Sequence, residues 1–155
     1  MRSLASSAAS IVAPLLVAAS LSAADPPAFE LETIRGRVVF LHEALEKKYG
    51  IRAVPEAKER ALALQTAEGT LVPLVEDVRG RAFRADERLR QPEVELLVRR
   101  YRGSPAVQII RVFEVAKDGK YELDYWCDIC AIAMFEQKPC DCCQGETELR
   151  RRKAE

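Results

Sequence analysis

Residues 93–101 read EVELLVRRY and residues 106–115 read AVQIIRVFEV. Both runs are rich in valine, isoleucine, leucine and aromatic residues, which are the residue types that favour strands. The four residues between them read RGSP, a composition typical of a turn. These two runs predict a pair of strong strands joined by a short turn, and they set the expectation that the domain is mainly β.

Weaker segments on both sides extend the pattern to six short strands with glycine-containing turns. A first strand starts at Glu30, with a bulge or sharp bend expected at Gly36. Residues 61–66 and 70–75 predict a hairpin, and residues 121–126 alternate apolar residues with acids as a last strand does. An all-β domain with one or two short helices is therefore expected.

Helical signals are few. Leu41, Leu45 and Tyr49 recur at helical spacing with charges between them, and Gly50 follows as a cap. Residues 76–91 read as a long charged connection with a helical turn near its end. The sequence thus predicts one short amphipathic helix after the first strand.

The N-terminal residues have the order of a secretory signal. Arg2 precedes an uncharged stretch rich in alanine, serine and leucine, and small residues precede the first acid, Asp25. Cleavage is expected after Ala24, or after Ala23. An uncleaved anchor is the alternative, but serines and Pro14 dilute the stretch below what a membrane span needs. We therefore expect an exported protein, periplasmic or secreted, with no stable membrane span after cleavage.

The charge balance excludes a strongly basic or acidic protein. The chain has 24 Lys and Arg against 24 Asp and Glu, so losing Arg2 with the signal leaves 23 against 24 and a net charge of −1. Residues 76–102 are rich in arginine, whereas residues 114–148 are mostly acidic around the cysteines. There is no global electrostatic case for nucleic-acid binding.

The strand pattern of residues 31–115 resembles a small OB-fold barrel. The resemblance rests on the glycine-bearing first strand, on the hairpin with its aliphatic run, and on residues 94–103, which are similar to the family's closing strand V-x-V-x-G-R-x-Y-x-G. Arg100 stands where the family tends to have small residues. The resemblance implies a fold that binds oligonucleotides, oligosaccharides, metals or proteins, and no particular activity. Nucleic acid is not expected, because acids interleave the arginines and the protein is exported.

All five cysteines lie within residues 127–143. The first group reads Cys-Asp-Ile-Cys and the second reads Cys-Asp-Cys-Cys, so the two share a Cys-Asp-x-Cys pattern. The pattern selects Cys127, Cys130, Cys140 and Cys143 as metal ligands and leaves Cys142 as a spare or alternative ligand. Two such turns aim four thiolates at one tetrahedral ion, Zn²⁺ above all. The spacing resembles a short zinc ribbon or half of a rubredoxin site.

Other chemistries fit the same cysteines. Iron suits four sulfurs, and an exported chain meets an oxidising compartment in which two disulfides and one free thiol would form. The Trp126-Cys127-x-x-Cys130 run resembles the motif of thioredoxin-like proteins, but only 25 residues follow it, and nearby acids would raise the thiol pKa. In such a metal-handling or thiol-redox accessory protein, Cys142 would be the exchangeable sulfur.

No catalytic constellation emerges from the remaining residues. His42, the single histidine, is expected on the outer side of its helix, and Asp77 and Asp86 are expected as surface ion pairs in an arginine-rich loop. No nucleophile elbow or phosphate loop is present. We therefore expect no enzyme, but an exported binding or accessory module whose protein or small ligand the sequence does not identify.

The chain is accordingly divided into four parts. Residues 1–24 are the signal peptide, residues 25–126 the OB-like β domain, residues 127–145 the cysteine-rich metal or disulfide lobe, and residues 146–155 a charged helical or frayed tail. As a whole, the chain resembles uncharacterised small exported bacterial proteins with an OB-like domain and a zinc-ribbon-like C-terminal segment.

Overall fold

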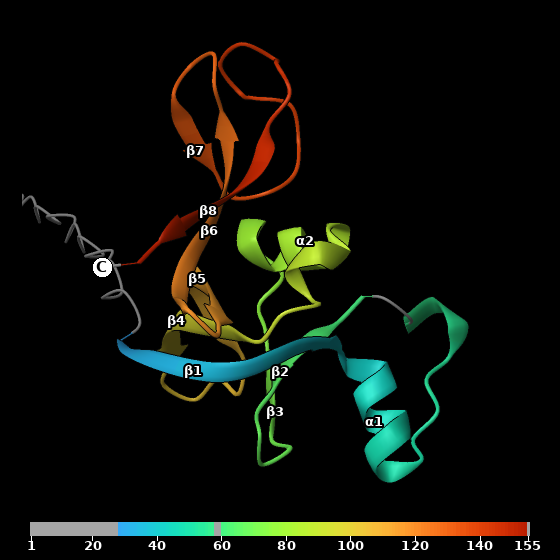
Figure 1. Cartoon of the computed structure of the whole chain (residues 1–155). Helices are drawn as coiled ribbons and strands as arrows, with labels where there is room; N and C mark the ends of the chain where they lie inside the picture. The colour runs from blue at the N-terminus through green and yellow to red at the C-terminus, as the bar shows by residue number, and fades with distance from the viewer. Residues whose placement is uncertain (1–27, 58–59, 155) are drawn as a thin grey trace, which may run out of the picture.

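A computed structural model describes residues 28–57 and 60–154 of the chain, and the predicted signal peptide lies outside these residues. An eight-stranded antiparallel sheet with the order β3-β2-β1-β4-β5-β6-β7 forms the protein, and β8 pairs with β6 (Figure 1). The strands are β1 (Phe29–Phe40), β2 (Leu62–Gln65), β3 (Leu71–Pro73), β4 (Val94–Tyr101), β5 (Val107–Ala116), β6 (Gly119–Cys127), β7 (Ile132–Met134) and β8 (Glu148–Lys153). The prediction of a mainly β protein is confirmed.

The first strand changes partner at Gly36. Residues Phe29 to Gly36 pair with β4, whereas residues Arg37 to Phe40 pair with β2. A Cβ atom on Gly36 would lie 2.2 Å from the carbonyl oxygen of Gln65, so only glycine lets the two backbones approach this closely. The bend expected at this glycine is therefore a switch between two strand partners.

Two α-helices flank the sheet. The helix α1 (Leu41–Tyr49) ends at Gly50, whose left-handed φ of 70° closes it as the sequence predicted. The helix α2 (Val78–Ala85) was not predicted. It begins at Asp77, whose side chain accepts the N–H groups of Arg79 and Gly80, a capping signal hidden in the run of charges. Neither helix has the length and apolar character needed to span a membrane, and the described residues hold no other α-helix.

The core lies between α2 and the sheet. Phe83 of α2 and Tyr125 of β6 are fully buried, as are the inward side chains of the central strands. The latter are Val38, Leu64, Val94, Leu96, Val98, Val107 and Ile109. Side chains at alternate positions of β4 point inward, which confirms the strand assignment of the run that begins at Glu93.

The sheet is not closed, so the predicted OB-like barrel is not confirmed. A single parallel bridge, Leu74 to Val107, joins the end of β3 to the start of β5. The Val75 N–H also donates to the carbonyl oxygen of Val107 at 2.9 Å. Pro73 has no N–H and ends β3 after three residues, so no continuous ladder forms there.

The prediction of a helical or frayed tail is wrong. The strand β8 lies along β6 in a ladder of six residue pairs, and the pair of Trp126 and Glu148 forms one end of that ladder. Bidentate ion pairs hold the strand, with Arg150 on Asp124 at 2.8 Å and Arg151 on Glu114 at 2.7 and 2.9 Å. The arginines that suggested a solvated tail are thus partners of acids on β5 and β6.

Candidate metal centre

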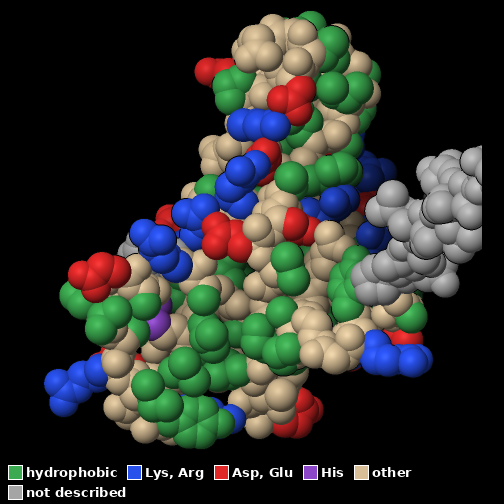
Figure 2. All heavy atoms as spheres, turned by 180° about the vertical axis from the view of Figure 1, so that it is seen from behind, with side chains coloured by type: hydrophobic (Ala, Val, Ile, Leu, Met, Phe, Trp, Pro, Cys, Tyr) green, Lys and Arg blue, Asp and Glu red, His purple; other side chains and the backbone are tan. Residues whose placement is uncertain are grey.

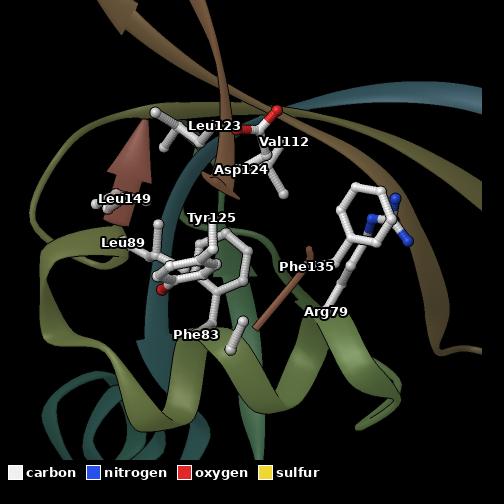
Figure 3. A pocket seen from close by; sticks show the side chains of 10 residues that line it. Arg79, Phe83, Leu89, Val112, Leu123, Asp124, Tyr125, Phe135 and Leu149 are labelled. Carbon is white, nitrogen blue, oxygen red and sulfur yellow. The ribbon is translucent and has the colours of Figure 1, made fainter. Parts of the chain in front are cut away.

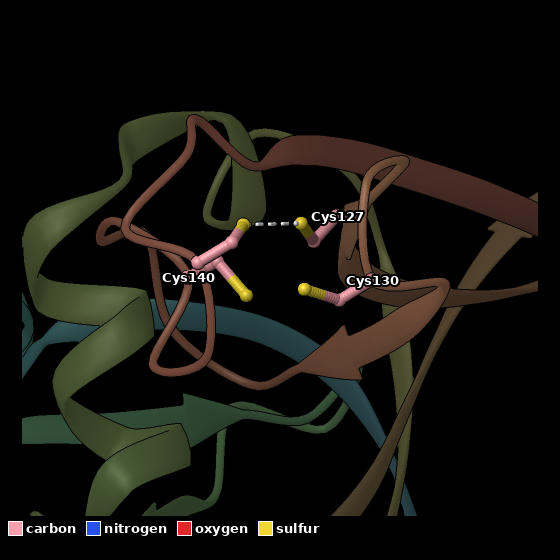
Figure 4. A group of neighbouring side chains, drawn as sticks. Cys127, Cys130 and Cys140 are labelled. Atoms are coloured by element: carbon pink, nitrogen blue, oxygen red, sulfur yellow. Dashed lines mark hydrogen bonds between the residues drawn. The ribbon is translucent and has the colours of Figure 1, made fainter.

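Four sulfur atoms converge at the end of the sheet that carries β7. The Sγ atoms of Cys127, Cys130, Cys140 and Cys143 all lie within 4.8 Å of one another and could hold a metal ion. Figure 4 shows the labelled cysteines pointing toward one another from two facing loops. A tetrahedral ion with zinc–sulfur bonds of about 2.3 Å sets its ligands about 3.8 Å apart, which is the scale of this cluster.

The two loops repeat one local geometry. The N–H of Ala131 donates to the carbonyl of Cys127 at 2.8 Å, and the N–H of Gln144 donates to the carbonyl of Cys140 at 2.9 Å. Ala131 and Gln144, each placed directly after the second cysteine of its group, both have left-handed φ angles, 52° and 60°. The shared Cys-Asp-x-Cys pattern therefore builds two equivalent turns, each presenting two sulfurs to the same point.

Backbone N–H groups also contact the sulfurs. Those of Cys143 and Cys142 lower the pKa of Cys140 to about 7. The N–H of Gly145 lies 3.4 Å from the sulfur of Cys143. Such donors stabilise thiolates, which are the form that binds a metal. The second loop is thus preorganised to supply negative sulfur.

The first loop has the opposite balance. The N–H of Cys130 favours the thiolate of Cys127, but burial and the neighbouring thiols of Cys140 and Cys143 outweigh it and raise the pKa of Cys127. The neighbouring thiols of Cys142 and Cys143 raise the pKa of Cys130. A thioredoxin-like nucleophile needs a lowered pKa at the position of Cys127, so the raised pKa counts against a redox role for the Trp126-Cys127-x-x-Cys130 run.

The fifth cysteine lies at the edge of the cluster. Cys142 is exposed, as is its neighbour Cys143, whereas Cys127 and Cys140 are buried. Its sulfur is not among the four that lie mutually within 4.8 Å. The structure thus separates the adjacent Cys142 and Cys143 into an outer thiol and a member of the cluster.

The loops between the cysteines dock on α2. The buried carboxylate of Glu136 accepts a 2.6 Å hydrogen bond from Arg81 and lies 3.1 Å from the ammonium of Lys138. Arg79 lies over the ring of Phe135 at 3.7 Å, and Figure 3 shows the two side chains face to face. These contacts fix the cysteine-bearing residues 127–147, the cysteine lobe, against the rest of the protein.

A small cavity lies behind this contact. Phe83, Leu89, Tyr125 and Phe135 are among the residues that line it, and its volume of about 20 Å³ is enough for one water molecule (Figure 3). It is too small to admit a substrate. A larger surface groove of about 250 Å³ runs between α2 and the lobe, lined by Val78, by β7 and by the residues that follow β7.

The structure places three other residues that the sequence singled out, and two of them are more buried than expected. The His42 side chain is only 12% exposed and packs beside Phe40, so the expected outward position is wrong. Asp77 caps α2 and accepts a hydrogen bond from Gln108. Asp86 is 4% exposed, so its expected surface position is also wrong: it accepts hydrogen bonds from Arg88 and Tyr125. None of the three belongs to the four-sulfur cluster.

Comparison of the chain with protein-family models, with curated proteins and with solved structures finds no match. The assignment of function therefore rests on the geometry of the described residues.

Proposed function

We propose that Cys127, Cys130, Cys140 and Cys143 bind one Zn²⁺ ion as a closed structural site. The observation that carries the proposal is the convergence of four sulfurs from two equivalent turns. Four thiolates saturate a tetrahedral ion and leave no open position for a substrate. The ion supplies folding energy, because the ligands come together only when the lobe is folded.

The spacing of the sulfurs favours a metal over two disulfides. The sulfurs of Cys127 and Cys143 lie 3.5 Å apart, whereas a disulfide bond is about 2.05 Å long. In a pair of disulfides each sulfur needs only one sulfur neighbour, yet here each cysteine faces three others. A shared ion explains that arrangement directly.

The zinc supports a binding surface in this proposal. The lobe has almost no apolar interior of its own beyond Met134 and the buried cysteines, so it is a small unit that needs a metal to stay folded. It forms one wall of the groove beside α2. We propose that the whole protein is an exported, non-enzymatic binding or accessory module whose metal keeps this wall in place.

We also propose that the first five strands are a partly open relative of the OB fold. The strand order β3-β2-β1-β4-β5, the helix α2 between β3 and β4, and the parallel bridge from Leu74 to Val107 support it. This fold commonly serves ligand binding, which agrees with a binding module.

The adjacent cysteines supply the test. We would purify the protein without chelator, together with Cys143→Ser and Cys142→Ser, and measure metal content and mass by native mass spectrometry. The parent and Cys142→Ser should carry one zinc with the loss of four thiol protons, whereas Cys143→Ser should lose most of its zinc. A metal-free parent about four daltons lighter than the reduced chain would replace the zinc site by two disulfides.

A second candidate function is metal handling, favoured by the position of the spare thiol. Cys142 is exposed and interacts with the ligand Cys130, so it could take over the ion during transfer to a partner. In that case Cys142→Ser would keep its zinc but release it to a competing chelator more slowly than the parent. Equal release rates for the two proteins would rule out metal handling through Cys142, and the structural role would be the one that remains.

A further inference from the structure

A second surface lies at the opposite end of the protein from the cysteine lobe. The chain leaves the sheet at Phe40, runs through α1 and returns to β2 by a connection that projects beyond the sheet (Figure 1). Residues 47–54, here called the tip, cover the end of α1 and the start of that connection. Viewed from behind, hydrophobic side chains gather over this region (Figure 2).

The tip exposes large apolar side chains in close succession. Tyr49 is 59%, Ile51 54% and Val54 62% exposed. Scattered apolar residues on a surface need no explanation, but a cluster of them on one projection marks a contact surface. The helix does not need these side chains for its own packing, because the buried residue of α1 is Ala44.

The same segment carries positive charge that no carboxylate of the described residues neutralises. Lys47, Lys48 and Arg52 are exposed, and the tip contains no acid, although Glu46 and Glu56 lie just outside it. No carboxylate of the described residues lies within 4.0 Å of these three cations. Lys48 donates instead to the carbonyl of Gly69 at 2.6 Å.

Several exposed cations on the sheet are paired, although others, such as Arg37, Arg102 and Lys117, are not paired within the described part of the chain. Arg35 lies on Glu93, Arg111 on Glu122 and Lys120 on Glu95, each within 3.0 Å. The tip differs by its combination of features: three cations without a carboxylate partner among the described residues lie beside three exposed apolar side chains. This combination indicates a partner that offers anionic groups next to an apolar phase.

We propose that the tip docks on the surface of an anionic lipid bilayer. Lipid headgroups supply the negative charge, and the acyl boundary accepts Ile51 and Val54. Tyrosine is favoured at this depth, because its ring is apolar and its hydroxyl reaches water. A projecting shape suits a bilayer, whereas a peptide partner calls for a groove, and the grooves beside α2, around Gly36 and around Tyr101 are not lined by any residue of the tip.

The test is co-sedimentation of the full chain with vesicles of phosphatidylcholine alone and of equal parts phosphatidylcholine and phosphatidylglycerol. We expect binding only to the anionic vesicles and a loss of binding as sodium chloride is raised. Lys47→Gln should weaken it about fivefold, since one surface cation contributes about 1 kcal/mol. Lys117→Gln, at a turn on the sheet, is the control for charge.

Val54→Ser and Leu31→Ser form the matched apolar pair, because both parent side chains are 62% exposed but Leu31 lies on β1. Val54→Ser should weaken binding several-fold and Leu31→Ser should not. All variants share one N-terminus, so any contribution of residues 1–27 cancels. Any of four results would overturn the proposal. These are equal losses of binding in the apolar pair, unchanged binding in every tip variant, equal binding to neutral and anionic vesicles, and binding to polyglutamate but not to vesicles.

Discussion

The hydroxyl of Tyr125 on β6 donates a 2.7 Å hydrogen bond to the buried carboxylate of Asp86 at the end of α2. The same carboxylate caps the following 3₁₀ turn (Glu87–Leu89) by accepting the N–H of Arg88. Burial, followed by the Asp86 carboxylate, raises the pKa of Tyr125, so the phenol stays protonated and can donate. One side chain thus joins the helix to the sheet that carries the cysteine lobe.

Replacing this carboxylate should make the protein less stable at neutral pH. Burial alone would raise the pKa of Asp86, but the hydrogen bonds from Arg88 and Tyr125 outweigh it and lower the pKa. Asp86→Asn should therefore cost about 2 kcal/mol in the free energy of unfolding, measured by urea titration.

The stability lost in Asp86→Asn should depend on pH in one direction. Because the folded pKa of Asp86 is lowered, its contribution is fully present above the unfolded value of about 3.9 and is lost as the pH falls through the folded value. The stability difference between parent and Asp86→Asn should shrink on acidification. A difference that stays constant down to strongly acidic pH would show that the carboxylate charge is not what stabilises the junction. Glu87→Gln, at the exposed residue that follows Asp86, is the control.

Removing the metal should unfold the lobe and spare the sheet. After treatment with a strong chelator, the amides of Ala131 and Gln144, which close the two cysteine turns, should lose protection in hydrogen–deuterium exchange. Amides of β4, in the middle of the sheet, should keep theirs. Unchanged protection at both turns would mean that the lobe folds without an ion.

Glycine at position 131 should tighten metal binding. Ala131 has a φ of 52°, a conformation that costs an L-residue with a Cβ about 1 kcal/mol or more. Ala131→Gly relieves that strain but gains chain entropy when unfolded, so the net gain should be about 0.5 to 1 kcal/mol, or two- to fivefold in zinc affinity. Competition with a chromophoric chelator measures it. Ala133→Gly, within β7, should weaken binding or leave it unchanged.

Arg150 should matter more to stability than its neighbour Arg152. Arg150 pairs with the 3% exposed Asp124 and stacks on Trp126 at 3.7 Å. Removing it leaves a buried carboxylate with only Arg152, 3.3 Å away. Arg150→Met should cost about 2 to 3 kcal/mol in unfolding free energy, and the half-exposed Arg152→Met less than about 1 kcal/mol. A double change with Asp124→Asn should recover part of the loss.

Local patterns in the sequence predicted the elements whose cause is local. The helix α1 and its glycine cap, the strands β2 to β6 and the pairing of the two cysteine groups follow from spacing and residue type. The helix α2 was missed because its signal, the Asp77 cap, lies in a charged run that looks like a loop. The strand β8 was missed because its stability comes from acids on β5 and β6 that are distant in sequence.

Burial of charged groups was the other source of error. Asp86 and Glu136 are acids that look solvated in the sequence, yet tertiary contacts with arginine and tyrosine cover them. Local sequence patterns also could not predict whether the barrel closes, because closure depends on how far pairing between β3 and β5 continues past Pro73. The four-cysteine cluster was the simplest to foresee, since its ligands repeat a short motif.

The cysteine lobe, which includes the short strand β7, begins after Trp126 and ends before Glu148, and these two residues are partners in the ladder of β6 and β8. The backbone of the lobe therefore enters and leaves at two neighbouring positions, like the end of a long hairpin, and side-chain contacts with α2 hold it from the side. A segment attached in this way can be lengthened, shortened or exchanged over evolutionary time without disturbing the register of the strands beneath it. The cysteine lobe is therefore attached as an insertion at the end of a hairpin, and a change in its length need not alter the pairing of β6 with β8.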